Sequence, residues 1–381
     1  MLSIPSRLPD IGITIFDVMT KMANEHGAIN LSQGFPDFDI DPKLVALVHE
    51  YMVKGHNQYA TMPGVAALRQ ILAEVIGKTY NHKVSWETDI TVTSGATEGI
   101  FACISAFISP GDEVILFDPA YDSYDPAIRL NGGIPVQINL TFPDFSIDWD
   151  QVKKKITSRT RMMMINTPHN PTGSVLKRND LEELERIALK HNLIVLSDEV
   201  YERLIYDDLI HQSVLSLPGL ASQSLAIFSF GKTFHATGWK MGYVVAPESL
   251  SREVKKTHQF IVYSVNTPIQ YALSEYLKDP GNYNRLGKFY QEKRDFFLQQ
   301  MSGSSFEPLK SQGSYFQLFS YKNISDKSDI EMAEEMTKKF KVACIPVSVF
   351  YKDKTDNRLL RFCFAKKLET LEKAGCILRK L

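Results

Sequence analysis

Residues 225–233 read LAIFSFGKT, and this stretch decides the fold. Its first four residues are apolar, as in a strand that is buried on both faces of a sheet. A small-residue turn follows and presents one amine, that of Lys232. Most lysines are solvated surface charges, but the buried run directly before Lys232 disfavours that interpretation. Polar turns at the ends of buried strands are where an open α/β sheet binds its ligand.

Five further short apolar runs have the same character, at residues 90–92, 113–117, 162–165, 193–196 and 243–245. Amphipathic segments separate several of them. In residues 179–191, acidic side chains gather in the first half, and Lys190 and His191 stand at the end, as a helix dipole prefers. This alternation predicts an α/β fold with a mostly parallel sheet covered by helices on both faces.

The last hundred residues have a different pattern. Strand-like runs at 315–319 and 359–364 flank a charged helix at about 329–340, which predicts a smaller α+β domain. Turn residues at 279–282 suggest the boundary. We therefore expect an N-terminal arm that forms part of the small domain (1–40), a large cofactor-binding domain (41–280) and a C-terminal small domain (281–381).

The composition is that of an ordinary globular protein, with 381 residues of which 44% are hydrophobic. The 43 basic and 44 acidic side chains give a net charge of −1, so nucleic acid or an anionic membrane is not an expected partner. The sequence shows neither a membrane span nor a signal peptide. Four scattered cysteines form no CxxC pair, so we expect no metal site and a reduced, cytoplasmic setting.

Two polar segments suit a phosphate group and a flat ring. Residues 93–98, TSGATE, lie between a predicted strand and a helix, where free backbone N–H groups favour an anion. An ordinary helix cap by Ser94 or Thr97 is the alternative. Tyr121 follows another predicted strand and could stack on a ring, or could simply be a core or loop tyrosine.

Three further polar residues stand at or within predicted strands. Asp198 ends a buried run, where a carboxylate needs a partner such as a protonated ring nitrogen, unless it caps a helix. Asn170 lies in the turn NTPHNPTG (166–173) and could donate to a phenolate oxygen, or merely form the turn. Arg361 lies among apolar residues and needs an anion, either a substrate carboxylate or an internal acidic side chain.

Together these groups predict the cofactor pyridoxal 5′-phosphate (PLP). The Lys232 amine can bond covalently to its aldehyde. Ser229 and Lys240 can hold its phosphate, one by a hydrogen bond and one by charge. Asp198 would keep its ring cationic, so that the ring withdraws electrons. A neutral lysine is needed for proton transfer, and we expect the ring and Lys240 charges to lower the pKa of Lys232.

The set of motifs resembles the class I and II aminotransferases of PLP fold type I. The resemblance rests on residues 170–173 (NPTG), 198–201 (DEVY), 229–232 (SFGK), 238–242 (GWKMG) and Arg361, in the family's order, and extends from residue 30 to residue 361. Residues 31–38 (LSQGFPDF), 57–59 (NQY) and 264–268 (SVNTP) are similar to the kynurenine and glutamine type, and above all to bacterial methionine aminotransferase.

The resemblance implies a role for each matching residue. Lys232, Asp198 and Tyr201 would be catalytic. The expected cofactor contacts are Ala96, Thr97, Tyr121, Asn170, Asp198, Tyr201, Ser229, Lys232, Lys240 and, from the neighbouring subunit of a homodimer, Tyr59. The expected substrate contacts are Gly34, Phe35, Asn170 and Arg361.

Two departures from the family pattern leave the cofactor assignment intact: Lys240 replaces an arginine found in many members, and Tyr121 replaces a phenylalanine or tryptophan. No arginine for a second carboxylate stands out. We therefore expect transamination between a 2-oxo acid and an apolar, sulfur-containing or aromatic amino acid, methionine first, with phenylalanine, tyrosine, histidine, kynurenine and glutamine also open. One alternative is a PLP-dependent β-lyase acting on cysteine conjugates or cystathionine. The other is a non-catalytic aminotransferase-like binding module, which the absence of a basic patch disfavours.

Overall fold

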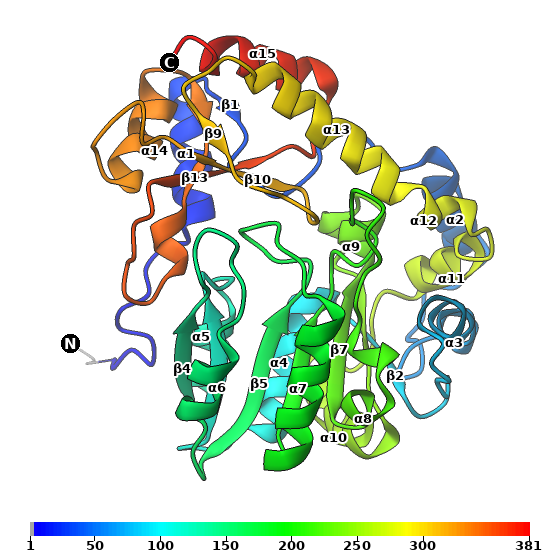
Figure 1. Ribbon diagram of the computed structural model, residues 1–381. Helices are drawn as coiled ribbons and strands as arrows, with labels where there is room; N and C mark the ends of the chain where they lie inside the picture. Colours follow the sequence, from blue (N-terminus) through cyan, green and yellow to red (C-terminus); the bar gives the residue numbers. More distant parts are fainter. Residues whose placement is uncertain (1–3) are drawn as a thin grey trace.

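The computed structural model describes residues 4–381, so residues 1–3 of the predicted N-terminal arm lie outside the described part. A seven-stranded sheet in the order β2-β8-β7-β6-β5-β3-β4 forms the centre of the larger unit (Figure 1). Its strands are β2 (Ile90–Thr93), β3 (Glu113–Asp118), β4 (Ile134–Asn139), β5 (Thr160–Asn166), β6 (Ile194–Asp198), β7 (Ser224–Ser229) and β8 (Gly242–Val245). All neighbouring strands are parallel except β8, which runs antiparallel to both β7 and β2.

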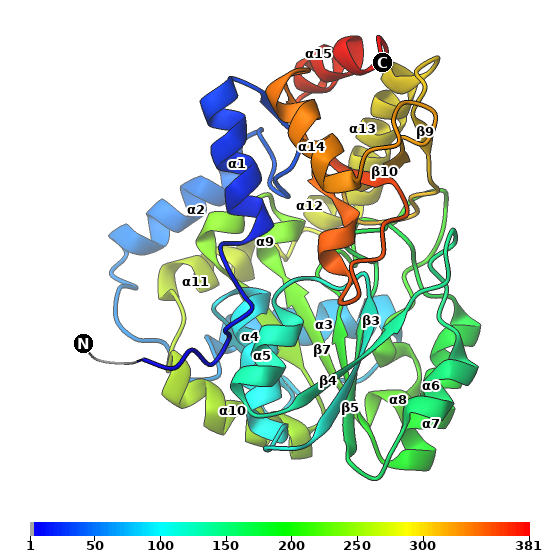
Figure 2. The same cartoon turned by 90° about the vertical axis from the view of Figure 1, so that its left-hand side faces the viewer.

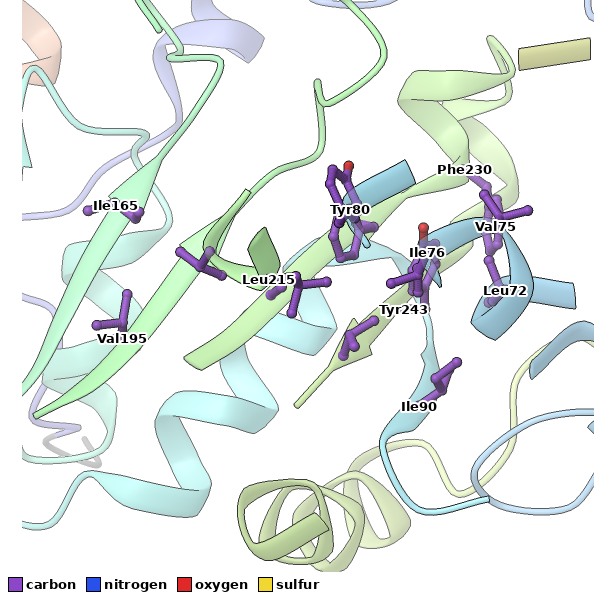
Figure 3. Packing of buried hydrophobic residues seen from close by; sticks show 14 of the residues in the cluster. Leu72, Val75, Ile76, Tyr80, Ile90, Ile165, Val195, Leu215, Phe230 and Tyr243 are labelled. Atoms are coloured by element: carbon purple, nitrogen blue, oxygen red, sulfur yellow. The ribbon is translucent and has the colours of Figure 1, made fainter. Parts of the chain in front are cut away.

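Helices cover both faces of this sheet. Successive strand residues point to opposite sides, and here both sides carry apolar side chains that must be buried. In β6, for example, Ile194 and Leu196 join one apolar cluster and Val195 joins the other. The first face carries α4 (Gly95–Phe107), α5 (Tyr124–Leu130) and α10 (Glu248–Ile261). The second carries α2 (Pro42–Val53), α3 (Ala66–Tyr80), α6 (Trp149–Lys155), α7 (Arg178–His191), α8 (Pro218–Ala221) and α11 (Thr267–Tyr276). Figure 3 shows Leu72 and Ile76 of α3 in this second cluster, beside Ile90 and Tyr243 of the sheet.

The smaller unit contains an antiparallel sheet in the order β12-β13-β10-β9. Its strands are β9 (Glu307–Pro308), β10 (Phe316–Ser320), β12 (Ile345–Pro346) and β13 (Leu359–Cys363), and its helices are α13 (Leu286–Met301), α14 (Asp329–Lys338) and α15 (Leu368–Leu378). From the N-terminal segment, α1 (Ile15–His26) packs beside α14, and β1 (Ile29–Asn30) pairs with β11 (Val342–Ala343) (Figures 1 and 2). Short elements complete the fold: η1 (Val214–Ser216), α9 (Phe230–Thr233), η2 (Thr237–Trp239), α12 (Gly281–Asn284) and η3 (Val347–Phe350).

The fold predicted from the sequence is confirmed, and each predicted strand occurs within one or two residues of its expected position. Strand β4 was not predicted, because this edge strand is only partly buried and contains Pro135 and Gln137. The domain limits stay a prediction, although α12 does begin at the expected turn. Among residues 4–381, no helix is both long and apolar enough to cross a membrane.

Gly242 is a position where the backbone of neighbouring segments leaves no room for a side chain. A Cβ atom there would lie 2.7 Å from the Phe228 carbonyl oxygen and 2.9 Å from the Ala96 backbone nitrogen. Gly242→Ala is therefore expected to lower the free energy of unfolding in urea by about 1–3 kcal/mol. Gly238→Ala is the control, because its Cβ would meet nothing within 4 Å, and it should change stability by less than about 0.5 kcal/mol. Equal losses in the two variants would contradict this account.

Candidate active site

A cavity of about 210 Å³ lies at the carboxyl ends of the central strands, and segments from both chain ends help to line it. Eleven of the predicted site residues surround it: Gly34, Ala96, Thr97, Tyr121, Asn170, Asp198, Tyr201, Ser229, Lys232, Lys240 and Arg361. Strand register explains much of this convergence. Asn166 at the end of β5 is the register partner of Asp198 at the end of β6, and β7 ends beside them at Ser229. Parallel strands thus deliver their polar ends to one edge of the sheet.

Lys232 extends from the short helix α9 into this cavity. Its Nζ donates hydrogen bonds to the Tyr315 hydroxyl at 2.9 Å and to the Gly34 carbonyl at 3.3 Å. Burial is the main cause that lowers the pKa of Lys232 to about 8; the Arg361 and Lys240 charges act in the same direction, and Cys363 and Asp198 act against it. The expected effect of Lys240 is therefore present, but burial is the main cause. A large fraction of the amine is neutral near pH 8, as nucleophilic and proton-transfer chemistry requires.

Asp198 lies at the end of β6 and is 5% exposed. The interpretation as a helix cap is wrong, because residues 200–203 form a turn rather than a helix. Its Oδ2 accepts a hydrogen bond from the Tyr124 hydroxyl at 2.5 Å, and its Oδ1 accepts one from the Val200 N–H at 3.3 Å. Burial raises the pKa of this carboxyl to about 6. Asp198 forms no salt bridge within the described part of the chain, so a cationic group in the cavity would stabilise its ionised form.

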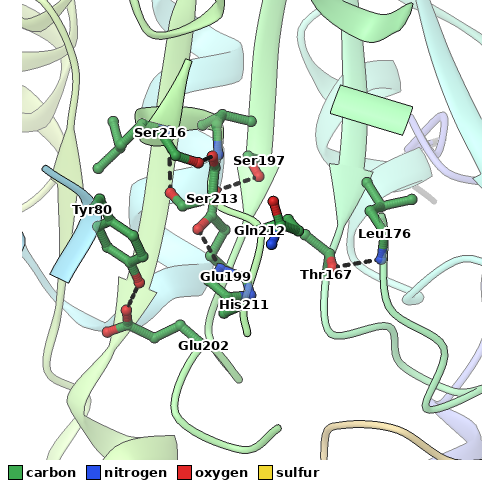
Figure 4. A network of polar contacts seen from close by, with 12 residues as sticks. Tyr80, Thr167, Leu176, Ser197, Glu199, Glu202, His211, Gln212, Ser213 and Ser216 are labelled. Atoms are coloured by element: carbon green, nitrogen blue, oxygen red, sulfur yellow. Dashed lines mark hydrogen bonds and ion pairs between the residues drawn. The ribbon is translucent and has the colours of Figure 1, made fainter. Parts of the chain in front are cut away.

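The turn after Asp198 is fixed by a second buried carboxylate, that of Glu199 (Figure 4). Glu199 Oε1 accepts hydrogen bonds from the Ser197 hydroxyl at 2.9 Å and the Val214 N–H at 3.1 Å. Its Oε2 lies 2.7 Å from Nε2 of His211. These contacts on the side away from the cavity hold the turn that presents Asp198 and Tyr201.

Arg361 on β13 is the most deeply buried cation of the site, with 1% of its surface exposed. Its Nη1 donates to Asn170 Oδ1 at 2.7 Å and its Nη2 to the Ser32 carbonyl at 3.0 Å, while the guanidinium stacks 3.8 Å from the centre of the Phe316 ring. The alternative of an internal salt bridge is wrong, because no acidic side chain among residues 4–381 pairs with it. Its buried Nε has no hydrogen-bond partner within the same residues. A carboxylate in the cavity would match this cation.

The first turn of α4 provides the place for a phosphate. Ser94 is the N-cap residue, but its side chain makes no capping hydrogen bond, so the alternative of a Ser94 side-chain cap is wrong. Ala96 and Thr97 line the cavity at this positive helix end. The Lys240 amine lies close by, since a Cβ atom on Gly95 would be 3.5 Å from its Nζ. Ser229 also lines the cavity, so the groups present fit a bound phosphate.

Two predicted residues lie outside the cavity. Phe35 is 44% exposed, and its ring packs against the Lys366 amine at 4.8 Å. Tyr59 is 84% exposed and meets the ring of Tyr263 edge-on at 5.7 Å between centroids. Within one chain, neither side chain contributes to the site.

The structure also adds residues that the sequence did not reveal. The Tyr315 hydroxyl is hydrogen-bonded to both the Lys232 amine and the Gly34 carbonyl. From the sequence, Tyr315 was predicted only as a residue of a strand. Phe16 of α1 reaches the cavity and packs 5.2 Å from the Arg361 guanidinium, with no local motif to mark it. Tyr124 lines the cavity as well, and its position three residues after the predicted Tyr121 was the available signal.

Comparison with known proteins identifies the class. The chain matches the family of class I and II aminotransferases over residues 26–375, and it belongs to this family. It is 45% identical to methionine aminotransferase of Escherichia coli (strain K12), with 99% of this chain and 98% of that protein covered. It is 34% identical to kynurenine–oxoglutarate transaminase 3 of Mus musculus, with 98% and 89% covered.

Solved structures agree with this assignment. The structure of E. coli YbdL, described as having a methionine aminotransferase function, has a TM-score of 0.98 with this chain at 44% identity, and all of both chains is covered. The protein is therefore an aminotransferase, and the predicted family, fold class and enzyme class are confirmed.

Arg361→Lys tests whether the planar guanidinium, and not only its positive charge, is needed to bind the substrate carboxylate. Lysine keeps the charge but loses the planar fork that bonds Asn170 and Ser32. We expect the KM for the amino-acid substrate to rise about 10- to 100-fold in steady-state assays. Arg358→Lys, at a partly exposed arginine of the same unit that pairs with Asp326, is the control and should leave KM unchanged. An unchanged KM in Arg361→Lys would exclude the assigned contact.

Proposed function

We propose that this enzyme uses PLP to transfer the amino group of methionine, or of another apolar, sulfur-containing or aromatic L-amino acid, to a 2-oxo acid. One observation carries the cofactor proposal. A single cavity contains a lysine amine with a pKa of about 8, a buried carboxylate with no salt-bridge partner among residues 4–381, and a helix N-terminus beside a second lysine. These three features suit the aldehyde, the ring nitrogen and the phosphate of PLP respectively.

Eight residues that line the cavity have a matching part of the cofactor. Ala96, Thr97, Ser229 and Lys240 would hold the phosphate, Asp198 the ring nitrogen, Tyr201 and Asn170 the ring hydroxyl oxygen, and Tyr121 one face of the ring. When bound, PLP supplies an electron sink that stabilises negative charge at the substrate Cα atom.

Lys232 is proposed to move the substrate proton. Its Nζ is held in the cavity by Tyr315 and Gly34, and its lowered pKa makes the neutral, proton-accepting form available near neutral pH. The same nitrogen, once protonated, can donate the proton to the carbon of the cofactor's aldehyde group. One group therefore serves as both base and acid.

The cavity also supports the proposed donor class. Arg361 and Asn170 would bind the α-carboxylate that every amino acid carries. Apart from Arg361, the cations lining the cavity within residues 4–381 are Lys232 and Lys240, which already have proposed roles. No further cation of the described chain awaits a side-chain carboxylate there, whereas Phe16, Tyr121 and Phe316 provide aromatic walls. The likeness to methionine aminotransferase points to methionine within this class.

We further propose a cytoplasmic homodimer in which Tyr59 reaches the phosphate of the neighbouring subunit. Tyr59 and Phe260 are each more than four-fifths exposed, as expected of rings that meet a partner surface. Light scattering of the purified enzyme should give a dimer mass, and Tyr59→Phe should weaken cofactor binding without dissociating the dimer. A monomeric active enzyme would contradict this arrangement.

A donor panel tests the function. Purified protein with PLP should convert methionine and aromatic amino acids to 2-oxo acids, and should use aspartate at least about tenfold less well because no cation awaits its side chain. Lys232→Ala should lose at least about 10²- to 10⁴-fold in turnover. Lys255→Ala is the matched control, since burial lowers the pKa of Lys255 to about 8 as well, but this lysine lies outside the cavity. Pyruvate release from a cysteine conjugate, with no oxo acid from methionine, would instead identify a β-lyase.

A further inference from the structure

Tyr124 has no role in the function proposed so far, yet it makes the shortest contact to Asp198. It is the first residue of α5, and its hydroxyl lies 2.5 Å from Oδ2 of Asp198. Tyr124 is 4% exposed and Asp198 is 5% exposed, so water does not compete for this hydrogen bond. The distance is typical of a hydroxyl that donates to a charged carboxylate.

The direction of the hydrogen bond follows from the two groups. Burial raises the pKa of Tyr124 well above its ordinary value, and the nearby Asp198 charge raises it further. The phenol therefore keeps its proton and acts as the donor. Burial raises the pKa of Asp198, and the hydrogen bond from Tyr124 lowers it. The Val200 N–H and the Lys232 charge also lower the pKa of Asp198, whereas the Glu199 charge raises it. The other titratable groups facing Asp198 are Tyr121 and Tyr201, two phenols whose own pKa values are raised by burial.

We propose that Tyr124 is a positioning residue, whose hydroxyl holds the Asp198 carboxylate in one orientation and keeps it an acceptor for the ring nitrogen of the cofactor. This inference rests on the proposed PLP function. Tyr124 binds Oδ2 and the Val200 N–H binds Oδ1, so each oxygen is fixed by one donor and retains a lone pair. Without Tyr124, the carboxyl group can rotate about its broad terminal torsion, and its protonated form would present a donor instead of an acceptor.

Tyr124→Phe removes the hydroxyl and keeps the ring. The ring matters because it packs edge-on against Tyr121, at 5.7 Å between centroids, and Tyr121 is the predicted stacking residue. The matched control is Tyr276→Phe. The Tyr276 hydroxyl also donates to a carboxylate, Asp41 Oδ2 at 2.8 Å, but neither residue lines this cavity.

The first measurement uses the protein without cofactor. Carboxyl signals of ¹³C-labelled aspartate are followed by NMR against pH, with Asp198→Asn identifying the Asp198 signal. The wild-type midpoint is expected near pH 6, and loss of a donor to the charged form should raise it in Tyr124→Phe by about 1–2 pH units. An unchanged midpoint would overturn the inference.

The second measurement is the affinity of the cofactor-free protein for PLP, from absorbance titrations between pH 6 and pH 8.5. Because the variant carboxyl protonates at higher pH, its affinity should fall about 3- to 25-fold below wild type at pH 6.5, following the loss of the ionised carboxylate, and recover toward pH 8.5. Tyr276→Phe should follow the wild-type profile. A purely structural defect would lower affinity equally at every pH, and that result would overturn the inference.

The two measurements distinguish the failure of this inference from the failure of the proposed function. Wild-type protein that binds no PLP would overturn both. PLP binding and transamination by the wild type, together with an unshifted Asp198 titration in Tyr124→Phe, would overturn only the role of Tyr124.

Discussion

The site depends on one constraint: three ionisable groups of both signs border one cavity without neutralising one another. Lys232, Asp198 and Arg361 all line this cavity, and no salt bridge joins any of them within residues 4–381. Burial shifts the pKa of each toward its neutral form, lowering those of Lys232 and Arg361 and raising that of Asp198. A zwitterionic substrate and a cofactor with both a cationic nitrogen and an anionic phosphate suit this pattern of charges.

The charges are held apart by the fold. Asp198 is fixed by strand β6 and by the buried Glu199 network behind it, while Lys232 is carried by the short helix after β7. Arg361 comes from the other unit, and its hydrogen bond to Asn170 joins residues separated by 191 positions in the chain. The N-terminal segment completes the site, because it supplies Gly34, Phe16 and the Ser32 carbonyl. Folding of both units is therefore needed before the cavity exists.

The sequence predicted the parts of this site that reside in local motifs. A buried run followed by a polar residue identified Lys232, Asp198 and Asn170, because strand ends in an α/β sheet are read from hydrophobic periodicity. Phe16 and Tyr315 escaped prediction, since their place at the cavity comes from long-range packing of α1 and from the residue just before β10. The expected Lys240 effect on Lys232 was present but secondary, because the extent of burial follows from tertiary structure. Phe35 was expected to contact the substrate, yet its ring lies against the Lys366 amine outside the cavity.

The hydrogen bonds of the Lys232 nitrogen also bear on motion. This one atom is bonded to Gly34 and to Tyr315, which belong to the N-terminal and C-terminal segments of the smaller unit, while Lys232 itself belongs to the larger one. If a substrate or cofactor atom replaces either partner, one hydrogen bond between the two units is lost. Linkage between two equilibria is reciprocal, so closer contact between the two units would favour the state in which Lys232 is hydrogen-bonded to Gly34 and Tyr315, by the same free energy. The hydrogen bonding of this one amine and the contact between the two units are therefore linked.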